Sequence, residues 1–363
     1  MGRFIIAGGG TGGHLFPGIA IARELEGRFE KTEILFVVGR KKMEAKILAS
    51  YGYPVSSIHV EGLKGRGWKN GLAVLVKLPG ALFQSLAIIR EFSPALVLGV
   101  GGYSAGPICL AARLAGIPTA IHEQNSFPGL TNRLLSWIVD RVLISFEESR
   151  AHLRGDKIIL TGNPVREELF SKAGTEPRTR ADFTILVVGG SQGARAINEA
   201  FAEALTHMKK AGKVPEVIHQ TGEMDYTRVV EDYRDRGLTG EIVPFIKDMS
   251  RAYQRARVVI SRAGATTLSE LAALGKPSIL IPYPYAANQH QEVNARSLVQ
   301  AGGAEMILQG DMSAERLGLV IKGYMDDRVG LDRMGENARR VGRRDAARII
   351  VDQLTGMLAV SGN

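Results

Sequence analysis

A short apolar run that ends in a glycine-rich turn occurs twice in this 363-residue sequence, as FIIAGGGTGG at 4–13 and as TILVVGGSQG at 184–193. An apolar strand, a glycine-rich turn and then a helix are typical of Rossmann-like domains. Glycine lets backbone amides approach a phosphate, and the N-terminus of the following helix supplies a partial positive charge. The repetition predicts two such domains, each with a turn able to bind an anion.

Short β-rich runs alternate with helical patterns along the chain, which is the pattern of βαβ units around a parallel sheet. Expected strands lie at 4–8, 34–39, 95–102, 119–124 and 141–145, and the pattern restarts after Pro164 at 184–196, 216–222, 256–264 and 277–283. The predicted fold class is therefore α/β, with two Rossmann-like parallel-sheet domains at 1–165 and 166–344.

Composition and charge indicate a globular protein and exclude some classes of site. A chain with 45% hydrophobic and 23% charged residues can bury a sizeable core. Its single cysteine, Cys109, excludes a disulfide within the chain and a multi-cysteine metal site, which favours a cytoplasmic location. No targeting signal or long apolar run is visible. The net charge of +9 lies mostly in residues 1–166, but the basic segment 40–77 has few aromatic residues, so nucleic-acid binding is not expected.

The first turn also satisfies the G-x-G-x-x-G pattern of dinucleotide-binding enzymes. An NAD site usually has an acidic residue after the second strand to bind the ribose, but Val38-Gly39-Arg40 stand there. NAD is therefore disfavoured, and of the two dinucleotides only NADP remains. SRAGATTLSE at 261–270 offers a different nucleotide site, since Glu270 could accept two hydrogen bonds from a ribose diol. The alternative for Glu270 is a first-turn carboxylate that the helix dipole stabilises.

Seven motifs occur in order: GGGTGGH (8–14), GVGGYSAGP (99–107), HEQN (122–125), GNPVR (162–166), GGSQGA (189–194), FIKDM (245–249) and GATTLSE (264–270). This series resembles the MurG family of N-acetylglucosaminyltransferases, in glycosyltransferase family 28. The resemblance implies a GT-B fold, with the donor mainly on the C-terminal domain, the acceptor mainly on the N-terminal one, and a last helix at about 345–363 that packs back on the N-terminal domain. It also implies inverting transfer from UDP-N-acetylglucosamine to lipid I, the undecaprenyl-diphosphate-linked muramyl-pentapeptide, in peptidoglycan synthesis.

The resemblance further implies the residues that bind the substrates. They are Thr11, Gly12, Gly13 and Asn125 on the donor-sugar side, Arg166 and Ser191 at the diphosphate, Ile246 at the uracil, Ala265, Thr266, Thr267, Leu268, Ser269 and Glu270 around the ribose, and Gln291 at the sugar hydroxyls. Asn288 stands where the family more often has Asp, so the resemblance does not extend to a role that needs a carboxylate at 288.

The chemistry requires a base for the acceptor hydroxyl and stabilisation of the departing diphosphate. His14 is the first choice for the base, since neutral imidazole accepts a proton near neutral pH, and Glu123 is the alternative. The sequence contains no D-x-D motif, so we expect no metal and no cofactor, with the UDP-sugar as co-substrate. The rival activities are an NADP-dependent oxidoreductase, a UDP-N-acetylglucosamine epimerase or another glycolipid glycosyltransferase, and a non-catalytic membrane-binding protein.

The segment 71–92 carries an apolar stripe at helical spacing that includes Leu72, Val76, Pro79 and Leu82. Such a stripe is commonly part of a core. Here further apolar residues and the neighbouring cations suit anionic lipid head groups, and the implied acceptor is a polyprenyl lipid. We therefore expect peripheral contact with the cytoplasmic face of the cell membrane.

Overall fold

The computed structural model describes residues 2–9, 12–39, 42–60, 68–170, 183–190 and 193–361, without the side chains of 42–43, 68–77 and 360–361. The chain divides into two compact units. Unit 1 comprises residues 1–166 and 343–363, and unit 2 comprises residues 167–342. Each unit contains its own parallel sheet, so the predicted α/β class with two parallel-sheet domains is confirmed.

The sheet of unit 1 has the order β3-β2-β1-β4-β5-β6-β7 among the described residues. Its strands are β1 (Gly2–Ala7), β2 (Thr32–Val38), β3 (Val55–Ser57), β4 (Leu96–Gly99), β5 (Thr119–Glu123), β6 (Arg141–Ile144) and β7 (Ile158–Leu160). All neighbours pair in parallel, so the carboxyl ends of the strands lie at one edge. The chain leaves β1 toward β2 and returns to β4 on its other side, which places the topological switch point between β1 and β4.

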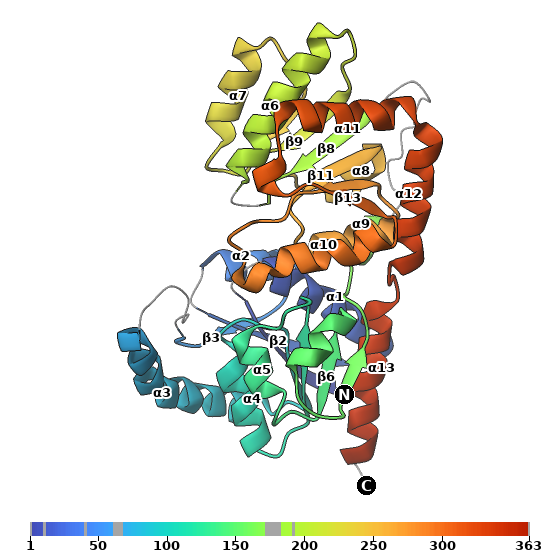
Figure 1. Ribbon diagram of the computed structural model, residues 1–363. Coiled ribbons are helices and arrows are strands. Elements are labelled where there is room, and N and C mark those ends of the chain that lie inside the picture. The colour runs from blue at the N-terminus through green and yellow to red at the C-terminus, as the bar shows by residue number, and fades with distance from the viewer. Residues whose placement is uncertain are drawn as a thin grey trace. The chain divides into compact units, whose positions relative to one another are not determined.

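Helices cover both faces of this sheet. Successive side chains of β1 point to opposite faces, so they show which helices cover each face. Phe4 and Ile6 belong to the same core as buried residues of α1 and α13, whereas Ile5 belongs to the core beneath α3, α4 and α5. The C-terminal helix α13 lies beside α1 (Figure 1). The helical elements are α1 (Gly12–Arg28), α2 (Lys42–Ser50), α3 (Trp68–Phe92), α4 (Ala105–Leu114), α5 (Leu130–Leu135), η1 (Glu147–His152) and α13 (Ala346–Ser361).

The sheet of unit 2 has the order β10-β9-β8-β11-β12-β13, again parallel throughout the described residues. Its strands are β8 (Thr184–Val188), β9 (Glu216–Gln220), β10 (Glu241–Val243), β11 (Val258–Ser261), β12 (Ser278–Leu280) and β13 (Ala304–Met306). The switch point lies between β8 and β11. Ile185, Val187 and Ile260 are fully buried in the core of this unit, together with Phe201 and Leu317.

The helical elements of unit 2 precede, separate and follow its strands along the chain (Figure 1). They are η2 (Glu167–Phe170), α6 (Arg195–Lys210), α7 (Tyr226–Asp235), α8 (Met249–Arg255), α9 (Ala265–Leu274), η3 (Ala287–Gln289), α10 (His290–Gln300), η4 (Gln309–Asp311), α11 (Ala314–Asp326) and α12 (Arg328–Val341). In the part of the chain that the structure describes, no helix combines the length and apolarity needed to cross a membrane.

Candidate active site

Two glycine turns meet at the switch point of unit 1. The amide of Gly9, after β1, donates to the carbonyl of Gly101, after β4, at 3.3 Å. Gly102 has φ +84°, and a Cβ there would lie 2.1 Å from the carbonyl oxygen of Gly9. Gly101 has φ +94°, and its Cβ would lie 2.8 Å from Nδ1 of His14. Both positions therefore require glycine, and Gly101 leaves room for the imidazole of His14.

His14 lies in the first turn of α1, where it is half-buried. Its Nδ1 is 2.8 Å from Oε1 of Gln124, which is buried immediately after β5. The structure thus brings together the first and third motifs of the series, 110 residues apart. Gly12 and Gly13 are the first two residues of α1 and present the positive end of its dipole at the same edge. Thr11 lies outside the described residues.

Glu123, the alternative base, differs from His14 in the number of hydrogen bonds that it already makes. Its buried carboxylate accepts hydrogen bonds from the Asn125 amide at 3.0 Å and side chain at 3.2 Å, the Gly129 amide at 3.1 Å and the Asn132 side chain at 2.8 Å. A carboxylate has about four lone-pair sites, and these four donors fill them. Glu123 therefore organises the loop after β5, including Asn125, and is poorly placed to take a proton from a substrate.

His122 is completely buried within the same cluster. Its Nε2 lies 3.0 Å from the Gly162 carbonyl, and Nε2 of Gln124 lies 3.0 Å from its Nδ1. Burial lowers the pKa of His122 to about 4; the hydrogen bond to the Gly162 carbonyl opposes this shift, and the electrostatic interaction with His14 adds to it. His122 is therefore neutral at physiological pH.

This lowered pKa predicts a loss of stability in acid. The unfolded chain protonates His122 below its ordinary pKa of 6.5 and the folded chain only below about 4, so the stability that neutral His122 supplies is complete above pH 6.5 and is lost as pH falls toward 4. The shift corresponds to on the order of 3 kcal/mol. Urea unfolding at pH 7 and pH 4.5 should show a smaller decrease for His122→Gln than for the wild type. His207→Gln, at an exposed position, should keep the wild-type decrease, and an equal decrease in all three proteins would contradict the prediction.

Arg166 extends the unit 1 site. Its guanidinium carbon lies 4.4 Å from the centre of the Phe16 ring on α1, a cation–π geometry. The aromatic ring fixes the positive charge beside the first turn of α1, where Gly12 and Gly13 begin the helix. This part of the unit is suited to an anionic group.

In unit 2, helices α6 and α9 begin after the neighbouring strands β8 and β11, at the switch point where open α/β sheets bind ligands. Gly193 has φ +84°, and a Cβ there would lie 2.5 Å from the carbonyl oxygen of Thr221, so the turn before α6 depends on glycine. Ser191 lies outside the described residues. Helix α9 begins at Ala265 after the extended Gly264, and Thr266, Thr267, Leu268 and Ser269 follow in its first turns.

Glu270 stands in the second turn of α9, not in its first, so the interpretation as a first-turn carboxylate does not apply. The residue is 6% exposed, and the Tyr253 hydroxyl donates to its Oε2 at 3.0 Å. A buried carboxylate needs such donors to stay ionised. Tyr253, on α8, has no motif of its own in the sequence, and only the fold brings it to Glu270.

Two further predicted residues are already bonded within unit 2. The Ile246 amide donates to Oε1 of Gln220 at 2.9 Å, so a base that binds the Ile246 backbone must use its carbonyl or displace Gln220. Oε1 of Gln291 accepts from the Tyr283 amide at 2.9 Å, which leaves the amide N–H groups of Gln291 as its donors toward a sugar. Asn288 has φ 52°, in the left-handed region that asparagine tolerates, and helps to turn the chain into α10.

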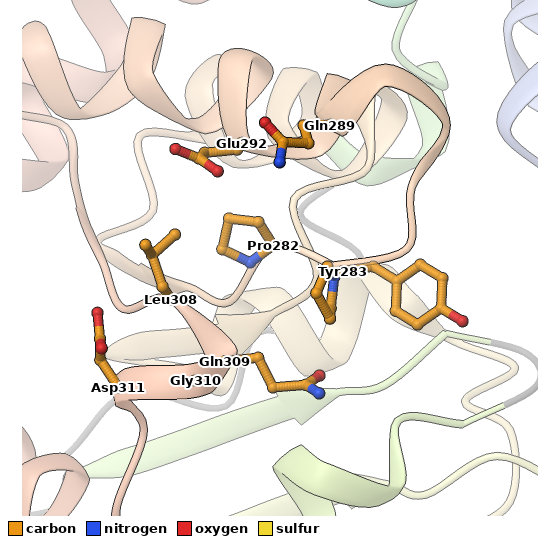
Figure 2. A pocket seen from close by; sticks show the side chains of 9 residues that line it. Pro282, Tyr283, Gln289, Glu292, Leu308, Gln309, Gly310 and Asp311 are labelled. Atoms are coloured by element: carbon orange, nitrogen blue, oxygen red, sulfur yellow. The ribbon is translucent and has the colours of Figure 1, made fainter.

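A pocket of about 250 Å³ lies beside this turn. Figure 2 shows Gln289 and Glu292 on one side of it and Gln309 and Asp311 on the other. Arg262, which sequence reasoning did not single out, fixes the loop at its edge by donating to the Ile281 and Pro282 carbonyls and to Oε1 of Gln309. Among the described residues, no group of three or more His, Cys, Asp or Glu side chains is placed to hold a metal ion.

The residues expected at the membrane divide into three groups. The side chains of Leu72 and Val76 lie outside the described part. Pro79 is exposed, and Leu82 is partly buried against the core beneath α3. Among the described side chains of α3, the exposed large apolar residues are Leu78, 38% exposed, and Phe83, 74% exposed.

Two family models match this chain, one in its N-terminal part and one in its C-terminal part. Residues 4–144 match the glycosyltransferase family 28 N-terminal domain, and residues 184–350 match the glycosyltransferase family 28 C-terminal domain. A relative from Syntrophus aciditrophicus, the "UDP-N-acetylglucosamine--N-acetylmuramyl-(pentapeptide) pyrophosphoryl-undecaprenol N-acetylglucosamine transferase", is 45% identical over 98% of this chain and 99% of its own length. The enzyme of the same name from Geobacter sulfurreducens is 45% identical over 97% and 98%.

Solved structures of other proteins have a similar fold. The crystal structure of Acinetobacter baumannii MurG is 31% identical, with a TM-score of 0.78 over 98% of this chain and 100% of that one. A UDP-GlcNAc 2-epimerase from Neisseria meningitidis bound to UDP-GlcNAc has a TM-score of 0.70 over 98% and 100% of the two chains, at 14% identity. At that identity the likeness shows the fold alone.

Proposed function

Because the chain belongs to glycosyltransferase family 28, we propose that it moves N-acetylglucosamine from UDP-N-acetylglucosamine to the C4 hydroxyl of the muramyl sugar of lipid I. The product is lipid II, the disaccharide lipid of peptidoglycan synthesis. The observation that carries the proposal is the 45% identity, over nearly the whole of both chains, to relatives named for this transfer.

The UDP part of the donor is assigned to unit 2. Helices α6 and α9 direct their N-termini to the switch point between β8 and β11, which suits the diphosphate. Glu270 is assigned to the ribose hydroxyls, the Ile246 backbone to the uracil, and the amide N–H groups of Gln291 to the sugar. Ser191 and Arg166 are assigned to the charge that develops on the leaving diphosphate.

His14 is assigned as the base. Its Nε2 takes the proton of the C4 hydroxyl as that oxygen attacks C1 of N-acetylglucosamine. The bond from C1 to the diphosphate oxygen breaks, UDP leaves with the bonding electrons, and the configuration at C1 is inverted. Support for His14 over Glu123 comes from the hydrogen bonds that already occupy the Glu123 carboxylate.

The proposed chemistry uses amides, hydroxyls and arginine for the leaving-group charge, so transfer should continue in excess EDTA. The measurement is initial rate of disaccharide formation with and without the chelator, with an EDTA-sensitive metal-dependent glycosyltransferase as the positive control. Activity that disappears with EDTA and returns with magnesium or manganese would contradict a metal-free reaction.

We also propose that unit 1 contacts the cytoplasmic face of the cell membrane, where the acceptor lipid resides. The supporting surface is the outer side of α3 with Leu78 and Phe83, and helix α5 with the exposed Leu134. Both helices pack against α4, so they lie on the same face of the sheet. Arg154 stacks over the exposed Trp137 ring at 5.2 Å, which places a cation beside this apolar surface, as anionic lipid requires.

Replacing Leu78 and Phe83 together by serine should weaken binding to anionic vesicles at least about tenfold, because burying one large apolar side chain contributes about 1.5–3 kcal/mol. Turnover of a soluble, short-chain acceptor should not change, since both side chains are exposed and lie outside the assigned site. Vesicle co-sedimentation measures the binding. Leu319→Ser, 69% exposed on α11 of unit 2, is the matched control, and wild-type binding by the double variant would place the membrane contact elsewhere.

A further inference from the structure

The cluster around His14 contains two residues, His122 and Gln124, that no part of the proposed reaction uses. They connect His14 to a backbone carbonyl through three successive hydrogen bonds. We propose that Gln124, oriented by His122, is a positioning residue that keeps His14 in the tautomer with hydrogen on Nδ1 and a lone pair on Nε2. This inference rests on the proposed function, in which Nε2 of His14 is the base.

The first link fixes His122. Its Nε2 lies 3.0 Å from the Gly162 carbonyl oxygen, which can only accept, so Nε2 carries the hydrogen. The Ser145 hydroxyl, which donates to the Glu123 carbonyl at 2.9 Å, offers a second acceptor 3.3 Å from the same nitrogen. A neutral imidazole with hydrogen on Nε2 has an acceptor at Nδ1. His122 therefore presents a lone pair to Gln124.

The second link fixes the orientation of the Gln124 amide. Its Nε2 is 2.9 Å from the Val100 carbonyl oxygen and 3.0 Å from Nδ1 of His122. These two acceptors use both amide hydrogens. The flipped amide would place Oε1 against two acceptors in a site that is 1% exposed, where an unmade hydrogen bond costs most. Oε1 must therefore point away from them.

The third link fixes His14. Oε1 of Gln124 lies 2.8 Å from Nδ1 of His14 and can only accept, so Nδ1 carries the hydrogen. Gly101, whose missing side chain leaves room for the ring, holds the imidazole against this contact. The opposite nitrogen, Nε2, is then the one with the lone pair. In the other tautomer Nε2 would carry hydrogen and could not accept a proton from the acceptor hydroxyl.

The tautomer is measured directly by ¹⁵N NMR of the imidazole nitrogens in full-length protein labelled at histidine, with the His14 signals assigned by their loss in His14→Gln. In the wild type we expect Nδ1 of His14 to be protonated and Nε2 to be unprotonated. Gln124→Leu should remove this preference and lower kcat roughly 10- to 100-fold, with KM for both substrates unchanged because Gln124 is buried and is assigned to neither substrate. Gln124→Glu keeps an acceptor for His14 and should retain the Nδ1–H tautomer and more of the activity.

The chain offers a matched control in Gln84, whose Oε1 lies 3.0 Å from Nδ1 of His59 at the surface of unit 1. Gln84→Leu should change neither the His14 spectrum nor kcat with a soluble acceptor. Hydrogen on Nε2 of His14 in the wild type, or an unchanged tautomer in Gln124→Leu, would overturn the inference. If the spectra behave as expected but His14→Gln and Gln124→Leu keep full kcat, the tautomer assignment stands and the role of His14 as base is refuted.

Discussion

Replacing His14 by glutamine is expected to lower kcat for N-acetylglucosamine transfer by roughly 10²- to 10⁴-fold, the usual contribution of a general base. Affinity for UDP should not change, because His14 is assigned to the acceptor hydroxyl and to no part of the nucleotide. Glutamine can still bond to Gln124, so the fold should persist. Steady-state rates with a soluble lipid I analogue, together with UDP calorimetry, test both parts.

Glu123→Gln is the comparison that separates the two candidate bases. The Glu123 carboxylate accepts hydrogen bonds from the amide and side chain of Asn125, from the Gly129 amide and from the Asn132 side chain on α5. An amide in its place would oppose N–H to N–H at one of these contacts, which should cost about 1–3 kcal/mol of stability. A stable Glu123→Gln with the larger loss of kcat, beside an active His14→Gln, would make Glu123 the base.

The second large effect is expected at Glu270. Removing a charged acceptor that bonds to the ribose should cost about 1.5–3 kcal/mol, or roughly a ten- to hundredfold loss of UDP affinity in Glu270→Ala. Calorimetric titration with UDP measures this loss, and circular dichroism shows whether the fold is kept. UDP affinity equal to that of the wild type would remove Glu270 from the site.

Two variants distinguish a contact with UDP from a purely structural role of Glu270. Tyr253→Phe removes only the hydroxyl that donates to Oε2 of Glu270, so it should lower the free energy of unfolding with little effect on UDP. Glu270→Gln keeps an oxygen for Tyr253 and loses the charge, so it should fold well and still bind UDP weakly. Equal UDP affinities in Tyr253→Phe and Glu270→Ala would show that the carboxylate acts only through Tyr253.

Local sequence patterns predicted much of the fold and part of the site. The apolar runs before glycine-rich turns predicted strands β1 and β8 and the helices after them, because the strand, turn and helix are consecutive. Glycine is needed after β1, where a Cβ at Gly8 or Gly9 would clash with neighbouring atoms, and after β8, where φ of Gly190 and Gly193 is positive. The HEQN motif directed attention to Glu123 and Asn125, and not to His122 or Gln124. It could not show that Gln124 reaches His14, because the contact joins α1 to the end of β5, and only the order of the sheet brings those ends together.

The apolar surface of α3 shows a second limit of prediction from sequence. Residues on more than one side of this helix are apolar, and periodicity alone does not say which side meets the core. Leu82, one of the residues expected at the membrane, is partly buried, because α3 turns Ala81 and Ile89 inward and leaves Phe83 to solvent. Similarly, Tyr253 and Gln220 carry no motif, and their bonds to Glu270 and Ile246 depend on packing between elements distant in sequence.

The most direct test of the proposed function is UDP release from UDP-N-acetylglucosamine by the full-length protein, measured with and without a lipid I analogue, with the sugar products identified by mass spectrometry. We predict that UDP release depends on the analogue and equals the amount of disaccharide formed. Conversion of UDP-N-acetylglucosamine without any acceptor, as an epimerase would catalyse, or no reaction in the presence of the analogue, would contradict the assignment.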